Sequence, residues 1–178
     1  MSLSAEQRAA RVRAVILDVD GVLTDGGLLY HADGESKMFN VRDGHGIVLA
    51  RLAGMRTAFL TGRVSEVVRR RAAELKIDAL REGVYRKGEA LPELLRVLEV
   101  KAEQVCYAGD DLVDLPVMKR VGFPVTVADA VPEVRAAAAW IAPSRGGQGA
   151  VREIMEFILK SNGMWNGMVR RHEQERYE

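Results

Sequence analysis

Two carboxylates separated by one residue open the segment DVDGVLTD, in which Asp18 and Asp20 directly follow the apolar run RAVIL. Such a run predicts a buried strand, and the carboxyl end of a buried strand is where open α/β sheets bind ligands. Charged groups held there are costly unless a cation or hydrogen-bond donors compensate them. Asp and Gly are also common where a strand runs into a turn, so this segment alone is consistent with a catalytic site or a turn.

Three further polar segments follow or approach predicted elements. Thr61 comes directly after RTAFL, Lys87 lies on a loop before a predicted helix, and GDDLVD at residues 109–114 follows QVCYA. Taken singly, the first is typical of a turn and the second of a solvated lysine. The third is typical of an acidic helix N-terminus, which the helix dipole stabilises. The third segment nevertheless crowds three carboxylates, which need a counter-charge and whose hard oxygens select Mg²⁺ or Ca²⁺. These carboxylates belong to Asp110, Asp111 and Asp114.

All four segments together contain the groups that phosphoryl transfer requires. These groups are a nucleophile, an acid/base, donors for the equatorial phosphate oxygens and ligands for a metal ion. Because the carboxyl ends of parallel strands share one edge of a sheet, the four segments can meet in a single crevice. The sequence therefore predicts a metal-dependent phosphoryl-transfer site at that edge.

The remaining sequence predicts the elements that would hold these groups in place. Short apolar runs alternate with segments of helical length, which indicates βαβ units and a parallel sheet covered by helices on both faces. We expect strands at residues 13–17, 56–60, 78–80, 104–108, 123–128 and 140–142. We expect helices at residues 47–54, 65–76, 88–98, 114–121, 132–139 and 151–160.

A protruding β-hairpin is predicted over about residues 27–41, before the first of these helices. Asp33-Gly34 is a strong turn signal, and the flanking runs LLYH and SKMFNV have the composition of short strands. The apolar side chains of the hairpin are too numerous for a two-stranded ribbon in water. We therefore expect them to pack against the same hairpin in other subunits.

Length and composition exclude several classes of protein. With 178 residues, of which 48% are hydrophobic and 29% charged, the chain fits one compact domain with an ordinary core. A net charge of +1 and 6% aromatic residues argue against a nucleic-acid partner. No apolar run approaches the about 18 residues of a membrane helix, and the single Cys106 favours a reducing, cytoplasmic location. We expect one Rossmann-like α/β domain over residues 1–160, without a cap domain, and a flexible tail over residues 161–178.

The order of the four segments is similar to that in the haloacid dehalogenase superfamily of phosphatases. That superfamily has DxDG with a further Asp soon after, Thr at a strand end, a later Lys, and GDDxxD. Longer stretches, covering nearly the whole chain, resemble the 3-deoxy-D-manno-octulosonate 8-phosphate phosphatases, a branch without a cap domain. The stretches are DGVLTDGGLLY, HADGESKMFNVRDGHGI, LTGRVSEVVRRRAAELKI, YAGDDLVDLPVMKRVG, VADAVPEV and GGQGAVRE.

The resemblance implies an activity, a cofactor and an assembly. The substrate would be a small sugar-acid phosphate and the cofactor Mg²⁺, with no nucleic acid or membrane as a partner. The reaction would hydrolyse 3-deoxy-D-manno-octulosonate 8-phosphate to the free sugar acid and phosphate through an aspartyl-phosphate intermediate, in lipopolysaccharide precursor synthesis. The resemblance also implies a homotetramer in which four hairpins meet and neighbouring subunits help to close each active site.

Position by position, the resemblance assigns catalytic roles to five residues. Asp18 corresponds to the nucleophile and a Mg²⁺ ligand. Asp20 corresponds to the general acid/base, and its backbone carbonyl also faces the metal. Thr61 and Lys87 match the groups that hold the transferring phosphoryl, and Asp110 matches the third protein ligand of Mg²⁺.

Further residues match the surroundings of the metal and of the sugar acid. Asp111 and Asp114 would support the metal ligands. Asp20 and Lys87 would also contact the substrate. The remaining positions of the substrate pocket match Asn40, Val41, Arg42, Asp43, Gly44, Arg63 and Arg71. Several arginines suit a substrate that carries a carboxylate as well as a phosphate.

Three alternatives remain open on the sequence. The sister branch that acts on nonulosonate (sialic-type) 9-phosphates tends to carry Thr-Gly-Glu, where this chain has Arg63 after Thr-Gly. A phospho-acceptor signalling domain also combines acidic residues, Thr and Lys around Mg²⁺, but its acceptor would lie on a middle strand. A non-catalytic relative that serves as a binding module is disfavoured by the complete set of catalytic positions.

Overall fold

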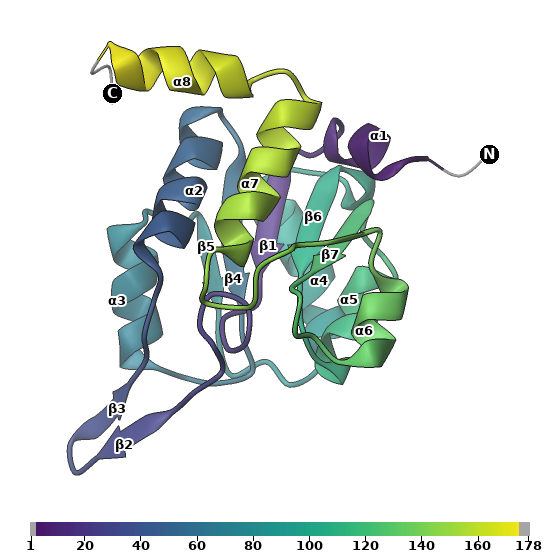
Figure 1. Cartoon of the computed structure of the whole chain (residues 1–178). Helices are drawn as coiled ribbons and strands as arrows, with labels where there is room; N and C mark the ends of the chain where they lie inside the picture. Colours follow the sequence, from purple (N-terminus) through teal and green to yellow (C-terminus); the bar gives the residue numbers. More distant parts are fainter. Residues whose placement is uncertain (1–2, 175–178) are drawn as a thin grey trace.

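A six-stranded parallel β-sheet forms the centre of the computed structural model, which describes residues 3–174 (Figure 1). Its strands are β1 (Ala14–Leu17), β4 (Arg56–Leu60), β5 (Ala79–Arg81), β6 (Val105–Ala108), β7 (Phe123–Thr126) and β8 (Trp140–Ile141). The strand order is β5-β4-β1-β6-β7-β8, so the first strand of the chain lies inside the sheet. Every residue of β1 and β6 is buried, because each strand is a continuous apolar run between two helical layers.

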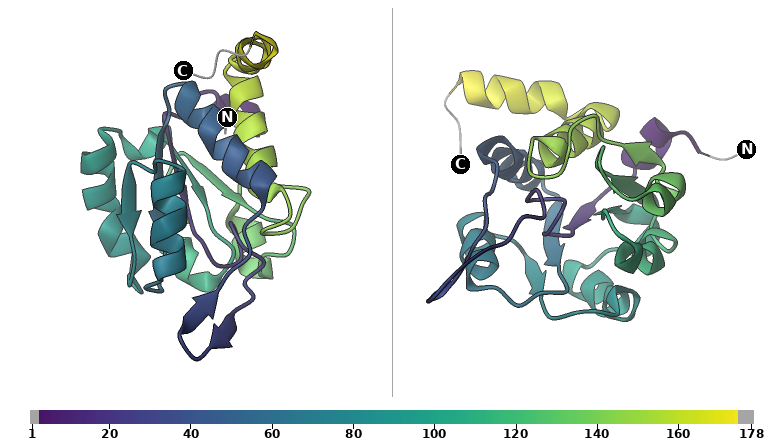
Figure 2. Two further views of the ribbon diagram at one scale, coloured as in Figure 1. Left: turned by 90° about the vertical axis from the view of Figure 1, so that its left-hand side faces the viewer. Right: turned by 60° about the horizontal axis from the view of Figure 1, so that its bottom comes forward.

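Helices cover both faces of this sheet (Figure 2). They are α1 (Ala5–Ala9), α2 (Val41–Leu52), α3 (Glu66–Glu74), α4 (Lys87–Leu98), α5 (Leu115–Met118), α6 (Pro132–Ala137), α7 (Ala150–Ser161) and α8 (Trp165–Glu173), with 3₁₀ turns η1 (Ala102–Gln104) and η2 (Leu112–Asp114). Helix α2 packs against α7, whereas α4, α5 and α6 connect strands on the opposite face, as right-handed crossovers require. The predicted Rossmann-like fold is confirmed, and no cap domain interrupts residues 3–174. None of the helices described is long and apolar enough to cross a membrane.

The protruding hairpin is present, but its strands are shorter than predicted. Strands β2 (Leu29–His31) and β3 (Gly34–Ser36) pair antiparallel and extend away from the sheet (Figure 1). His31 pairs with Gly34, so the turn residues are 32 and 33 rather than Asp33-Gly34. Residues 37–40, expected to extend the second strand, form an irregular connection to α2.

Helix α2 begins six residues earlier than the predicted start at residue 47. Asn40 caps it by accepting hydrogen bonds from the backbone N–H groups of Arg42 and Asp43, and Gly44 and Gly46 lie inside the helix. A Cβ at Gly46 would stand 3.0 Å from the backbone Cα of Arg152, so this glycine allows α7 to approach α2. The glycines that predicted a loop are therefore packing residues within a helix.

The C-terminal segment also differs from the prediction over part of its length. Residues 161–178 were expected to form a flexible tail, but Trp165–Glu173 forms helix α8. Met168 is 9% exposed, and the Trp165 ring lies 5.0 Å from the ammonium of Lys160. Met164, Trp165 and Met168 recur at helical spacing, which explains why one face of this polar segment packs on the domain. The last four residues of the predicted tail lie outside the described residues.

Candidate active site

A cavity of about 200 Å³ opens at the carboxyl edge of the sheet, beyond β1, β4 and β6. Its lining contains residues of all four polar segments. These residues are Asp18, Asp20, Thr61, Arg63, Lys87, Asp110 and Asp111. Asp18 and Thr61 each follow a parallel strand directly, and such strands end at a common edge, so the sheet topology accounts for their convergence.

Lys87, the first residue of α4, is buried between two carboxylates. Its Nζ lies 2.8 Å from Oδ2 of Asp18 and 2.7 Å from Oδ1 of Asp114. Asp18 Oδ1 accepts a hydrogen bond from the backbone N–H of Val19 at 2.7 Å. Burial alone would lower the pKa of Lys87, but the negative charges of Asp18 and Asp114 outweigh burial and raise it. Lys87 is therefore a fixed cation, and it holds the Asp18 carboxylate in one orientation.

Asp114 anchors the loop on the other side of the cavity. It has no exposed surface, and its Oδ1 accepts hydrogen bonds from Lys87 at 2.7 Å and from the Tyr107 hydroxyl at 2.6 Å. Its Oδ2 accepts from the backbone N–H groups of Asp110 and Asp111 at 2.9 and 3.2 Å. Both oxygens are thus engaged, and Asp114 supports Lys87 and the backbone that carries Asp110.

Three carboxylates form a group that fits a small divalent cation. Asp18, Asp110 and Asp114 each place one oxygen within 4.8 Å of the others. Oδ1 of Asp110 is buried and has no hydrogen-bond partner among the described residues. Because Asp114 already accepts four hydrogen bonds, Asp18 and Asp110 are the side chains available as ligands. The side chain of Asp20 lies outside this group.

The pKa shifts of these carboxyl groups also favour a bound cation. Burial raises the pKa of Asp18 to about 6; Lys87 opposes this rise and Asp114 adds to it. Burial, followed by the charges of Asp18 and Asp114, raises the pKa of Asp110 to about 7. Negative charge is therefore crowded and incompletely compensated, and a hard cation such as Mg²⁺ would relieve it.

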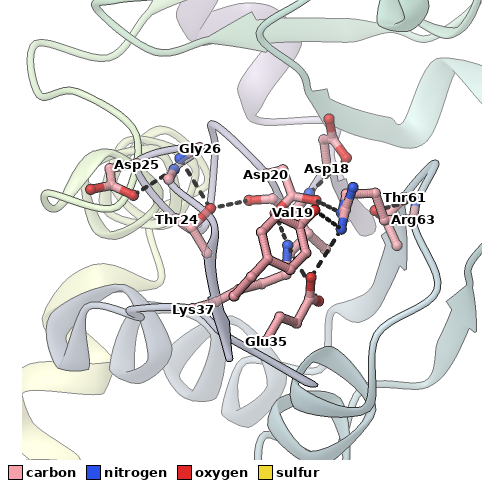
Figure 3. A network of polar contacts seen from close by, with 12 residues as sticks. Asp18, Val19, Asp20, Thr24, Asp25, Gly26, Glu35, Lys37, Thr61 and Arg63 are labelled. Atoms are coloured by element: carbon pink, nitrogen blue, oxygen red, sulfur yellow. Dashed lines mark hydrogen bonds and ion pairs between the residues drawn. The ribbon is translucent and has the colours of Figure 1, made fainter. Parts of the chain in front are cut away.

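Asp20 and Thr61 face the same cavity from neighbouring loops (Figure 3). Oδ1 of Asp20 is paired with the ammonium of Lys37, whereas Oδ2 is buried without a hydrogen-bond partner among the described residues. The Thr61 hydroxyl accepts a hydrogen bond from the backbone N–H of Arg63 at 3.3 Å. This leaves the hydroxyl proton of Thr61 and one oxygen of Asp20 for a bound molecule.

Arg63 lies in this cavity, but it already has partners from the hairpin. Its Nη2 is 2.9 Å from Oε2 of Glu35 and 3.1 Å from the Tyr30 hydroxyl. Arg71 points elsewhere, to Glu74 at 2.9 Å. Of the three arginines predicted to bind the sugar acid, Arg42, Arg63 and Arg71, only Arg63 lines the cavity that contains Asp18.

The segment at residues 40–44 does not line the cavity around Asp18. Asn40, Val41 and Arg42 line a separate cavity of about 500 Å³, together with the start of α7. Asp43 is buried, and its carboxylate accepts hydrogen bonds from the backbone N–H groups of Gly149 and Arg152 at 3.2 and 2.7 Å. Asp43 thus caps α7. A role of this segment in the substrate pocket stays a prediction.

Three residues of this site were not identified from the sequence. Glu35 and Lys37 belong to the hairpin and its base, yet the Lys37 side chain is fully buried against Asp20. The only signal for them was a pair of opposite charges, GESK, inside a hairpin that also contains His31 and Asp33. Tyr107 stood in a run that predicts an ordinary core strand, and nothing in the sequence indicates its bond to Asp114.

This fold and this site define a class of protein, the haloacid dehalogenase-like hydrolases. The family of that description matches residues 77–154 of the chain. The chain is 43% identical over 164 residues to the 3-deoxy-D-manno-octulosonate 8-phosphate phosphatase of Escherichia coli (strain B / BL21-DE3), covering 92% of this chain and 87% of the relative. The chain belongs to the family of 3-deoxy-D-manno-octulosonate 8-phosphate phosphatases.

Solved structures of similar proteins agree with this assignment. The phosphatase of that name from Yersinia pestis has a TM-score of 0.89 at 43% identity, covering 92% of this chain and 89% of the other. The one from Moraxella catarrhalis has a TM-score of 0.91 at 36% identity, covering 94% and 97% of the two chains. That second protein was solved in complex with a magnesium ion, a phosphate ion and the sugar acid.

Proposed function

We propose that this chain hydrolyses 3-deoxy-D-manno-octulosonate 8-phosphate to the free sugar acid and phosphate, with Mg²⁺ as its cofactor. The observation that carries the proposal is the buried Asp18 carboxylate, fixed by Lys87 beside the unpartnered oxygen of Asp110. Membership of the family and the Moraxella catarrhalis complex support the choice of substrate and metal. The same proposal places the reaction in cytoplasmic lipopolysaccharide precursor synthesis.

In the first step, the Asp18 carboxylate attacks the phosphorus atom. A bond forms between a carboxylate oxygen and phosphorus, while the bond from phosphorus to the sugar oxygen breaks and its electron pair leaves with that oxygen. Asp20, protonated, gives its proton to this oxygen. Lys87 and Thr61 donate to the equatorial phosphoryl oxygens. Mg²⁺, held by Asp18, Asp110 and the backbone carbonyl of Asp20, would offset the repulsion between the carboxylate and the phosphate.

In the second step, water hydrolyses the aspartyl phosphate. Asp20, now a carboxylate, takes a proton from the water as its oxygen bonds to phosphorus. The bond between phosphorus and the Asp18 oxygen breaks, which restores the carboxylate and releases phosphate. One acid/base thus serves both steps, and its proton balance closes over a turnover.

Phosphate release across a small panel of substrates tests this proposal. The panel contains 3-deoxy-D-manno-octulosonate 8-phosphate, a nonulosonate 9-phosphate and p-nitrophenyl phosphate, each with Mg²⁺ and with chelator. We expect repeated turnover that needs the metal and the highest kcat/KM on the octulosonate. Preference for the nonulosonate would contradict the substrate but not the class. A single stoichiometric phosphorylation without turnover would instead indicate a signalling domain.

Metal binding is expected to stabilise the protein in a pH-dependent way. In the folded protein the pKa values of Asp18 and Asp110 lie above the ordinary value of 3.8. These two carboxyls therefore contribute to stability below pH 3.8, and this contribution is lost as the pH rises through about 6 and 7. Mg²⁺ binds only the ionised carboxylates and relieves their repulsion. Saturating Mg²⁺ should therefore raise Tm by about 5–10 °C at about pH 7.5 and by much less at about pH 5.

The matched variant for this measurement is Asp110→Asn. It removes one ligand and one buried charge, so it should raise Tm of the metal-free protein at neutral pH and abolish most of the shift with Mg²⁺. Differential scanning fluorimetry with and without chelator measures both effects. An equal Mg²⁺ shift at the two pH values, or one that persists in Asp110→Asn, would show that the metal binds elsewhere.

A homotetramer is part of the proposed function. Its support is the hairpin, where Leu29, Tyr30 and Met38 are 64%, 66% and 73% exposed. Such side chains are unfavourable on a solvated ribbon and are typical of an interface. We expect sedimentation at micromolar concentration to give a tetramer, and Leu29→Lys with Met38→Lys to give smaller species. Val97→Lys, which changes an exposed apolar residue of α4, should leave the tetramer intact. A monomeric native chain would contradict this expectation.

A further inference from the structure

Four charged side chains, of which Asp20 and Arg63 line the cavity, form a closed ring (Figure 3). Lys37 pairs with Oδ1 of Asp20 and lies 3.9 Å from Oε1 of Glu35. Oε2 of Glu35 is 2.9 Å from Nη2 of Arg63, and Nε of Arg63 is 4.0 Å from Oδ2 of Asp20. Positive and negative groups therefore alternate around the ring. Each carboxylate has a cation on either side.

The ring joins the hairpin to the catalytic edge of the sheet. Glu35 lies in β3 and Lys37 follows it, whereas Asp20 follows β1 and Arg63 follows β4. The Lys37 side chain has no exposed surface, although its neighbours Ser36 and Met38 are exposed. A buried ammonium is costly unless it is paired, so the inward orientation of Lys37 depends on Asp20 and Glu35.

The pairing makes the two oxygens of Asp20 unequal. Oδ1 is held by Lys37, while the buried Oδ2 accepts no hydrogen bond within the part of the chain that the structure describes. A carboxyl group held at one oxygen cannot rotate freely, and an acid/base must be aligned with the atom that exchanges its proton. Oδ2 instead faces Nε of Arg63 at 4.0 Å, and Asp20 and Arg63 both line the cavity.

We propose that Lys37 is a positioning residue, which holds Oδ1 of Asp20 so that Oδ2 exchanges the proton with the leaving oxygen and with water. Glu35 completes the arrangement by holding Lys37 and Arg63 on the opposite side. The hairpin thereby sets the geometry of the acid/base from within the same chain. This inference rests on the proposed role of Asp20 in phosphate ester hydrolysis.

Lys37→Met tests the inference, because it keeps an unbranched apolar side chain of nearly the same length and removes the ammonium. On the sugar-acid phosphate, kcat should fall by about tenfold to a hundredfold, part of the roughly 10²–10⁴-fold that general acid–base catalysis supplies. KM should change by less than about threefold, since Lys37 is not expected to contact the substrate. Lys37→Arg, which can still donate to Oδ1, should retain more activity than Lys37→Met. A rise in KM at unchanged kcat would make Lys37 a substrate ligand and overturn the inference.

Pre-steady-state kinetics separate positioning from general damage. The leaving group of p-nitrophenyl phosphate needs little protonation, so Lys37→Met should slow hydrolysis of the aspartyl phosphate more than its formation. A burst of p-nitrophenol, equal to the number of active sites, is expected before slow turnover. Ser36→Ala, one residue before Lys37, should behave as wild type, and sedimentation should show the same assembly for all variants. A uniform loss on both substrates without a burst would overturn the inference.

A double-mutant cycle with Asp20→Asn gives the decisive comparison. If Lys37 acts through Asp20, Lys37→Met should cause almost no further loss of kcat in the Asp20→Asn background. Multiplicative losses would show that Lys37 acts independently and would overturn the inference. Full activity of Asp20→Asn alone would instead contradict the proposed function, so the two failures can be told apart.

Discussion

Replacing Asp18 with Asn is expected to abolish turnover and to leave the fold intact. The amide of Asn cannot attack phosphorus as a carboxylate does, so kcat should fall by at least about 10⁴-fold. An amide oxygen can still accept the backbone N–H of Val19, and Lys87 keeps Asp114 as its partner. Because the variant also removes a carboxylate whose burial is costly, the free energy of unfolding should change by only about 1–2 kcal/mol.

Two measurements on the same preparation test this prediction. Phosphate release gives kcat, and mass spectrometry of acid-quenched protein shows whether a phosphoryl group is attached to the peptide that contains Asp18. Asp78→Asn is the matched control: Asp78 pairs with Arg56 at 2.8 Å and lies next to the amino ends of β4 and β5, opposite the catalytic edge. The control should lose some stability and keep its activity. Near-normal turnover of Asp18→Asn would refute the covalent mechanism.

The strands were predictable because their burial follows from the apolar residues of the local sequence. Each of β1, β4 and β6 is an apolar run that ends in Asp, Thr or Gly, and both faces of such a strand must be covered. The start of α2 was predicted wrongly, because a glycine can indicate either a loop or close packing between helices. Gly46 signals a loop in isolation, but here it permits close packing of α7 on α2, a fact that only the tertiary contact reveals. Helix α8 was missed for a similar reason, since its apolar face has too few residues to dominate its polar composition.

Some residues of the candidate site were likewise predictable from the sequence, and others were not. Asp18 and Thr61 follow strands directly and Asp110 follows one after a single glycine, so chain order and sheet topology place them together without further information. Contacts made by a protruding element are different, because the angle of a hairpin to the sheet is not encoded in its own sequence. Glu35 and Lys37 reach the catalytic edge through that angle, and their charges had no partner visible in the sequence.

Arg63→Glu is expected to reduce activity on the sugar-acid phosphate selectively. A guanidinium can pair with a carboxylate through two parallel hydrogen bonds, and Arg63 is the arginine among the predicted substrate contacts that lines the cavity with Asp18. In the free protein it binds the Glu35 carboxylate, so a substrate carboxylate meets a group already arranged for that charge. Losing a charge-assisted pair is worth about 1.5–3 kcal/mol, or about tenfold to more than a hundredfold in kcat/KM.

The comparison with p-nitrophenyl phosphate decides whether this loss concerns recognition. That substrate has no carboxylate, and Asp20 keeps its contact with Lys37 when Arg63 is replaced, so its kcat/KM should fall far less. Arg63→Met removes the attraction without adding repulsion and should lie between wild type and Arg63→Glu on the sugar acid. Arg70→Glu is the matched charge reversal: Arg70 is exposed on α3 and does not line the cavity, so it should affect neither substrate. Equal losses on both substrates in Arg63→Glu would mean that repulsion from Glu35 has displaced the hairpin, and no loss on either would remove Arg63 from the substrate pocket.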